Sequence, residues 1–212
     1  RAFGGLEMND EIAWRSRKRH FVERLELEYK IGRVDADIKP LLDAINNCEN
    51  YYTTSSCSGR IQVTLNKLPG DKFDIVTVAK WHRCIETDEL QQVLNELIAD
   101  KTENAWFAVQ PPIIHVVAKN LDAALDMLAT ARHCGFKHSG IQSIKKYKVV
   151  VEITGSERIE VPLIYNRLQL VNFESLSVLV DVANKVLTRS KEKMEKLRKL
   201  ISDGGLGKSR TG

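Results

Sequence analysis

The chain has 212 residues, of which 43% are hydrophobic and 28% charged, and its formal net charge is +4. These values predict a globular protein with a hydrophobic core, and the mildly basic charge permits nucleic-acid binding without requiring it. The longest apolar run is too short to cross a membrane, and the opening residues RAFGGLEMND hold no apolar signal-peptide core. We therefore expect a cytoplasmic protein.

Helical spacing of apolar residues recurs in five segments. We predict helices over residues 10–29, 36–48, 87–100, 121–134 and 173–200. Asp10, Asp35 and Thr87 stand where helices are predicted to begin, and their side chains are suitable N-caps. Gly135 is placed to end the fourth helix.

Between these helices the period changes to that of β-strands. We predict strands over residues 51–56, 60–65, 74–82, 105–109, 113–118, 140–145, 148–154 and 157–162, with a short one near 167–171. No G-x-G-x-x-G motif follows a first strand, so a Rossmann-type methyltransferase is excluded. The expected fold class is α+β, with mixed sheets flanked by helices.

We expect one compact domain over residues 1–201 and a disordered tail of Gly, Ser and Lys over 202–212. Ser58-Gly59 and Ser139-Gly140 each follow a helix and precede an alternating strand. This echo suggests an internal duplication with pseudo-repeats over 35–100 and 105–172, in which the two Ser-Gly turns face each other across one cleft.

The segment Thr53-Thr54-Ser55-Ser56-Cys57-Ser58-Gly59-Arg60 is the strongest candidate for a ligand site. Its hydroxyls and backbone N–H groups meet at a strand end, Gly59 permits a turn with positive φ, and Arg60 adds a fork of donors. Such a nest suits a phosphate or a carboxylate. The alternative is a polar turn with a buried Cys57.

Cys57 resembles a nucleophile only loosely. The loop of cysteine phosphatases has five residues between its Cys and its Arg, whereas two separate Cys57 from Arg60. Arg60 could still favour a thiolate, so a hydrolase remains an alternative function. No metal site is expected, because the nearest arrangement, His133-Cys134 with His138, lacks the close ligand pairs of a zinc site.

Two histidines are candidates for proton transfer. His82 follows Trp81, which could stack on a nucleic-acid base or fill the core. His115 lies in an apolar strand, where a core position is an equal alternative. Basic clusters at residues 15–20 and 189–199 are either solvated helix faces or two arms of one phosphate-binding surface.

These segments together resemble the third wybutosine-synthesising protein family. The resemblance covers about Trp14 to Lys199, and its specific part is the block Ser55 to Arg60. Weaker matches are Pro40 to Asp43, Ile114 to Val116, Gly135 to Ile141, Val161 to Leu163 and Val182 to Asn184. The sequence departs from the family where Trp81 replaces a Thr and where Gln110 replaces a Glu.

The resemblance implies methylation of N4 of a wyosine-type tricyclic guanosine, 3′ of the anticodon in tRNA-Phe, with S-adenosylmethionine as donor. His82 and His115 are then the candidate proton acceptors. Ser55, Ser56, Cys57, Ser58, Gly59, Arg60 and Trp81 would bind donor or substrate, and Ser139 and Gly140 would form the opposite wall. A non-catalytic RNA-binding module with a phosphate nest remains the alternative, and the oligomeric state stays open.

Overall fold

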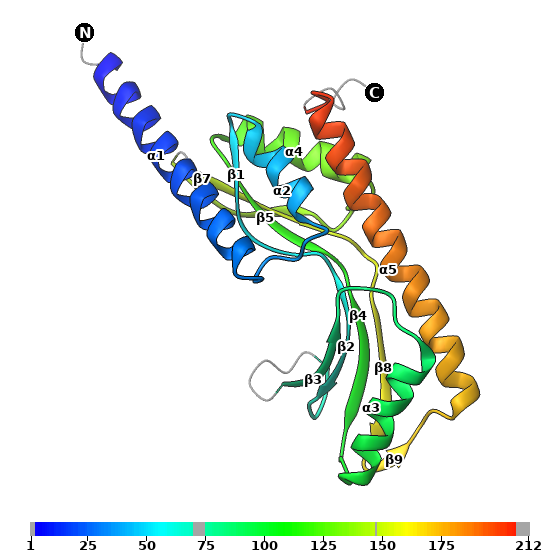
Figure 1. Ribbon diagram of the computed structural model, residues 1–212. Helices are drawn as coiled ribbons and strands as arrows, with labels where there is room; N and C mark the ends of the chain where they lie inside the picture. Colours follow the sequence, from blue (N-terminus) through cyan, green and yellow to red (C-terminus); the bar gives the residue numbers. More distant parts are fainter. Residues whose placement is uncertain (1–2, 70–74, 147, 207–212) are drawn as a thin grey trace. The chain divides into compact units, whose positions relative to one another are not determined.

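The structure is a computed structural model that describes residues 3–69, 75–146 and 148–206 (Figure 1). The chain folds into two compact units that interleave along the sequence. Unit 1 comprises Arg1–Ser58, Pro112–Ser156 and Glu192–Gly212, and unit 2 comprises Gly59–Pro111 and Glu157–Lys191. The helices are α1 (Phe3–Lys30), α2 (Lys39–Asn47), α3 (Thr87–Ala99), α4 (Leu121–His133) and α5 (Phe173–Ser202).

Unit 1 contains a four-stranded antiparallel sheet of order β1-β5-β7-β6. Its strands are β1 (Tyr51–Cys57), β5 (Ile113–Ala118), β7 (Lys148–Thr154) and β6 (Gly140–Lys145). On one face, α2, α4 and the last turns of α5 bury side chains such as Ile45, Met127 and Leu197 against Val116 and Val151. Alternation along the strands aims these residues inward, and their burial is the main stabilising term of this unit.

The other face of this sheet is partly covered by α1 (Figure 1). Trp14 packs on Tyr52 with ring centroids 5.1 Å apart, and Phe21 stacks on the same ring at 5.1 Å. Trp14 Nε1 donates to Glu49 O at 3.2 Å. Aromatic pairing of this kind adds to area burial, so α1 is anchored along the β1 edge of the sheet.

Unit 2 contains a five-stranded antiparallel sheet of order β3-β2-β4-β8-β9. Its strands are β2 (Arg60–Leu65), β3 (Val76–Trp81), β4 (Ala105–Gln110), β8 (Ile159–Tyr165) and β9 (Leu168–Gln169). Helix α3 and the first half of α5 bury one face through Leu90, Leu94 and Leu176 against Val63 and Phe107. The opposite face carries Arg60, Gln62 and Thr64 of β2 beside Ala108 and Trp106 of β4, because the strands alternate.

The predicted α+β class is confirmed, and every described strand pairing in both sheets is antiparallel. Most strand and helix bounds agree with the predicted ones, but the first two helices start at other residues, and the predicted N-cap of α3 is wrong. Helix α1 begins at Phe3, so Asp10 lies inside it. The N-cap of α3 is Glu86, in a capping box with Glu89, and not Thr87.

The predicted echo has a counterpart inside unit 1. Helix α2 leads into β1 at one edge of the sheet, and α4 leads into β6 at the other edge, with β5 and β7 between them. Residues 59–100, 105–111 and 157–172 of the predicted repeats belong to unit 2. The duplication and the single domain over 1–201 remain predictions.

The C-terminal segment is ordered beyond the predicted start of the tail. Helix α5 ends at Ser202, and Leu206 packs against the core of unit 1. Residues 207–212 lie outside the described residues. Over the described residues, no helix combines the length and apolar character that a membrane span requires.

Candidate functional site

The hydroxyl-rich segment forms the second half of β1 and the turn into β2. Ser55 is exposed, Ser56 and Cys57 are half-buried, and Ser58 is fully buried. Gly59 has φ +83°, as predicted from the need for a left-handed turn. The chain passes from unit 1 to unit 2 between Ser58 and Gly59, so each side of the turn is described within its own unit.

A β-bulge in β1 aims Ser55 at His115. The register pairs Thr53 with Val116 and then Ser55 with His115, so Thr54 is the extra residue. A bulge of this kind re-aims the side chains that follow it. Without it, alternation would place Thr54 opposite His115. Ser55 therefore owes its position to one inserted residue.

Ser55, His115 and Glu152 form a chain of hydrogen bonds across β1, β5 and β7. Ser55 Oγ lies 2.9 Å from His115 Nδ1, and His115 Nε2 lies 3.1 Å from Glu152 Oε2. A carboxylate only accepts, so Nε2–H donates to Glu152 and Nδ1 is left to accept from the Ser55 hydroxyl. The His115 side chain is 31% exposed, which contradicts the core alternative.

Glu152 was missed by the sequence analysis. It stands at an outward position of a strand that alternates regularly, where a glutamate is ordinary. Its significance comes from the register that pairs it with His115 in β5 and with Gly140 in β6. No local signal in the sequence reveals that pairing.

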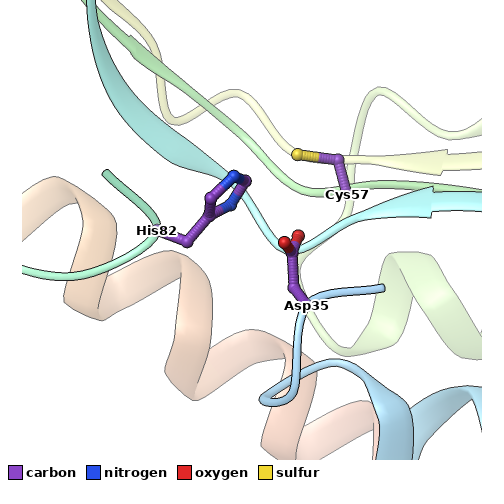
Figure 2. Close-up of side chains that lie close together, drawn as sticks. All are labelled: Asp35, Cys57 and His82. Atoms are coloured by element: carbon purple, nitrogen blue, oxygen red, sulfur yellow. The ribbon is translucent and has the colours of Figure 1, made fainter. Parts of the chain in front are cut away.

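Asp35 is a second residue that the sequence analysis misassigned. Helix α2 begins at Lys39, so Asp35 does not cap it. Instead Asp35 Oδ2 accepts a hydrogen bond from Ser58 N at 2.9 Å. A carboxylate oxygen of Asp35 also lies within 4.8 Å of Cys57 Sγ, as Figure 2 illustrates. A carboxylate beside the sulfur does not supply the positive charge that activates catalytic thiols, which favours a structural Cys57.

Asn46 of α2 holds the start of the segment. Its Oδ1 accepts from Thr53 N at 2.8 Å, and its Nδ2 donates to Thr53 Oγ1 at 3.0 Å. Both residues are buried, with Asn46 8% and Thr53 4% exposed. Because buried polar groups are costly without partners, these bonds fix Thr53 and therefore the bulge that follows it.

A pocket of about 190 Å³ in unit 1 opens beside the segment. It is lined by Phe21, Arg24, Leu25, Glu28, Arg33, Val34 and Leu42 together with Thr53, Thr54, Ser55 and Ser56. Arg24 and Arg33 both face the carboxylate of Glu28, at 4.0 and 3.5 Å. The pocket therefore combines an apolar wall, hydroxyls and guanidinium groups.

In unit 2, His82 follows β3 and is half-buried. Its Nδ1 donates to Gly59 O at 3.1 Å, which places the lone pair of the neutral ring on Nε2. Trp81 packs against the core of unit 2, as its structural alternative predicted.

Glu89 anchors the segment that carries His82. Hydrogen bonds from the Arg83 guanidinium, the Glu86 backbone and Trp81 lower the pKa of Glu89 to about 2. The two oxygens of Glu89 lie 2.6 and 3.0 Å from the Arg83 nitrogens, a bidentate pairing.

Ser139 and Gly140, the predicted opposite wall, differ in role. Ser139 is 2% exposed, donates to Phe136 O at 2.7 Å and accepts from Thr154 N at 3.2 Å. These contacts make it a structural residue of unit 1. Gly140 pairs with Glu152, so it ends the cross-strand row that begins at Ser55.

The basic clusters are largely engaged within the fold. Arg15 pairs with Glu11 at 3.0 Å on α1. Near the end of α5, Lys193 Nζ donates to Gly135 O at 3.1 Å and Lys196 Nζ to His133 O at 3.4 Å. Lysines at the C-terminal carbonyls of α4 stabilise that helix end, which favours a structural role for these two residues.

Comparisons with known proteins agree with this picture. The family model described as Methyltransferase TYW3 matches residues 16–203. A Pyrococcus furiosus protein named tRNA(Phe) 7-((3-amino-3-carboxypropyl)-4-demethylwyosine(37)-N(4))-methyltransferase 1 is 42% identical over 184 residues, 87% of this chain and 92% of that protein. A protein of the same name without the final number, from Archaeoglobus fulgidus, is 40% identical over 80% of this chain and 83% of its own length.

Solved structures also resemble this chain. A protein from Pyrococcus horikoshii has a TM-score of 0.82 at 39% sequence identity, over 90% of this chain and 97% of that one. A hypothetical protein from Aeropyrum pernix has a TM-score of 0.71 at 29% identity, over 80% of this chain and 98% of its own. Sequence and structure agree over nearly the whole length, and the chain therefore belongs to the TYW3 methyltransferase family.

Proposed function

We propose that this chain transfers the methyl group of S-adenosylmethionine to N4 of a wyosine-type tricyclic guanosine, 3′ of the anticodon in tRNA-Phe. The names of the relatives at about 40% identity describe this reaction, and the chain spans 92% of the Pyrococcus furiosus protein. The observation that carries the proposal is the Ser55–His115–Glu152 series of hydrogen bonds, which begins in the most family-specific segment.

N-methylation releases one proton, and the hydrogen-bonded series Ser55–His115–Glu152 can accept it. Ser55 Oγ would accept the N4 proton that methylation releases and would pass its own hydroxyl proton to His115 Nδ1. The distance of 2.9 Å from Ser55 Oγ to His115 Nδ1 permits that transfer. Glu152 then stabilises the imidazolium, because its carboxylate lies 3.1 Å from Nε2.

His82 is the second proposed proton acceptor, as the sequence analysis predicted. Its bond to Gly59 O leaves Nε2 as the basic nitrogen of the neutral ring. The two histidines differ in one testable respect. His115 is oriented by a carboxylate, whereas His82 is oriented by a carbonyl, so removal of Glu152 affects only the first.

The pocket of unit 1 fits S-adenosylmethionine in its chemistry. Phe21, Leu25 and Val34 offer an apolar wall for an adenine ring, the hydroxyls of Thr53 to Ser56 suit a ribose, and Arg24 and Arg33 suit a carboxylate. When bound, S-adenosylmethionine supplies a sulfonium methyl group that is already activated. The protein has to orient that donor and the base in line, and to take up the proton.

The test uses labelled S-adenosylmethionine and tRNA-Phe from a strain arrested before this step. We expect label transfer by the wild type. Replacing whichever of His115 and His82 accepts the proton with Ala should lower kcat by about 10²- to 10⁴-fold. For His115→Ala the matched control is His138→Ala, an exposed histidine of the same unit. Glu152→Gln should lower kcat more than it raises KM.

The same experiment separates the alternatives. Binding of tRNA-Phe with no binding of S-adenosylmethionine and no label transfer would favour the RNA-binding module. Full activity of Cys57→Ser would remove the hydrolase with a Cys57 nucleophile. Unchanged kcat in both His115→Ala and His82→Ala would refute the proposed proton acceptors while leaving the methyl transfer standing.

A further inference from the structure

The outer face of the unit 2 sheet carries a polar pocket of about 400 Å³. It is lined by Arg60, Gln62, Thr64, Asn66, Pro69, Ile75, Gln110, Arg158 and Glu160. All of these belong to unit 2, and the pocket is distinct from the one beside the hydroxyl segment in unit 1.

Strand register brings the lining side chains together. Ala108 in β4 pairs with Gln62 in β2 on one side and with Glu160 in β8 on the other, so these two side chains lie on the same face of the sheet. Ala108 itself is 1% exposed and lies between them. Trp106, the next residue on the same face, is held by Nε1 donating to Asn66 O at 3.1 Å.

The charges of the pocket are of both signs. Arg60 pairs with Gln110 across β2 and β4, and Arg158 lies one residue before the β8 partner of Val109. Arg60 Nε donates to Gln62 Oε1 at 2.6 Å, which directs its guanidinium. In the described part of the chain, the side chains of Arg158 and Glu160 make no ion pair with any other residue.

Two guanidinium groups and one carboxylate around a polar floor match a zwitterion. A phosphate would be repelled by Glu160, and a lone cation by the two arginines. An α-amino acid group complements both signs of charge, since its carboxylate can pair with arginine and its ammonium with Glu160. The name of the Pyrococcus furiosus relative specifies a base with a 3-amino-3-carboxypropyl chain, which ends in such a group.

We propose that Arg60, Arg158 and Glu160 form a subsite for the α-amino acid end of the 3-amino-3-carboxypropyl chain of the base. This inference rests on the proposed function and adds a determinant of substrate specificity to it. Arg158 and Glu160 recognise the 3-amino-3-carboxypropyl group, whereas other residues accept the proton. The methionine end of S-adenosylmethionine carries the same chemical group, so the test has to distinguish the two sources.

The experiment measures kcat/KM with two tRNA-Phe substrates. One carries the tricyclic base with the 3-amino-3-carboxypropyl chain, and the other carries the same base without it. For Arg158→Ala and Glu160→Gln we expect a loss of about 10- to 100-fold with the first tRNA and little change with the second. Arg158→Lys should recover part of the loss, and Lys185→Ala is the control for removing an exposed cation of unit 2.

Titration of each variant with S-adenosylmethionine alone is the second arm. An unchanged Kd for the donor together with selective loss on the chain-bearing tRNA supports the proposal. A raised donor Kd with equal losses on both tRNAs assigns the pocket to the donor and overturns it. Wild-type values of kcat/KM on both tRNAs in these variants would also overturn the proposal. Failure of the wild type to methylate either tRNA would count instead against the proposed function.

Discussion

Replacing Asn46 with Ala should destabilise unit 1 at the hydroxyl segment. The change removes the acceptor of Thr53 N at 2.8 Å and the donor to Thr53 Oγ1 at 3.0 Å, in a place where both residues are buried. A buried backbone N–H left without a partner costs about 1–3 kcal/mol. Taking about 2 kcal/mol, and a Tm shift of about 2–4 °C per kcal/mol for a chain of this size, we expect Tm to fall by about 4–8 °C.

Differential scanning calorimetry measures this shift. Thr53→Val is the matched control, because it removes the hydroxyl but keeps the backbone N–H bond to Asn46 Oδ1. It should therefore cost less than Asn46→Ala. Because the two residues share one network, the double variant should be less destabilised than the sum of the single variants. Equal Tm values for the wild type and Asn46→Ala would refute the view that Asn46 holds the segment.

Three further predictions follow from the geometry. Asp35→Ala should lower the free energy of unfolding in urea by about 1–3 kcal/mol, because Ser58 N loses its acceptor, and Asp35→Asn should restore most of it by keeping an oxygen there. The pKa of Glu89, lowered to about 2, gives stability that is present above pH 4.5 and lost as the pH falls toward 2. In Arg83→Gln that pKa should rise, so the stability difference from the wild type, measured by unfolding at each pH, should shrink over this range; a constant difference would contradict the pairing. Gly59→Ala should cost about 1–2 kcal/mol in urea unfolding, since φ is +83° there, and an unchanged midpoint would disprove that strain.

The elements and the family were determined by the sequence alone. Apart from the start of α1, the two-residue period of strands and the helical period of apolar residues located the elements to within a few residues, because the buried face of each element depends on local side-chain order. The Ser55 to Arg60 block carried the family resemblance, since hydroxyls, glycine and arginine in that order are rare in a plain turn. The positive φ of Gly59 was likewise a local property.

The sequence alone did not predict the roles of residues whose partners lie far away along the chain. Asp35 looked like a helix cap, but its carboxylate accepts from Ser58 N, 23 residues later. The interleaving of the two units along the chain also leaves no boundary to detect in composition. Such features arise only when segments distant in sequence are brought together by burial of the two cores.

The candidate proton chain illustrates the division most clearly. The sequence alone marked Ser55 and His115 as functional candidates, from their residue types and the segments that hold them. Tertiary structure alone brought them to 2.9 Å, through a bulge in β1 and antiparallel pairing with β5, and it added Glu152 from β7. Strand register is set by packing across the whole sheet, so the partner of a side chain on another strand is decided only when the sheet forms.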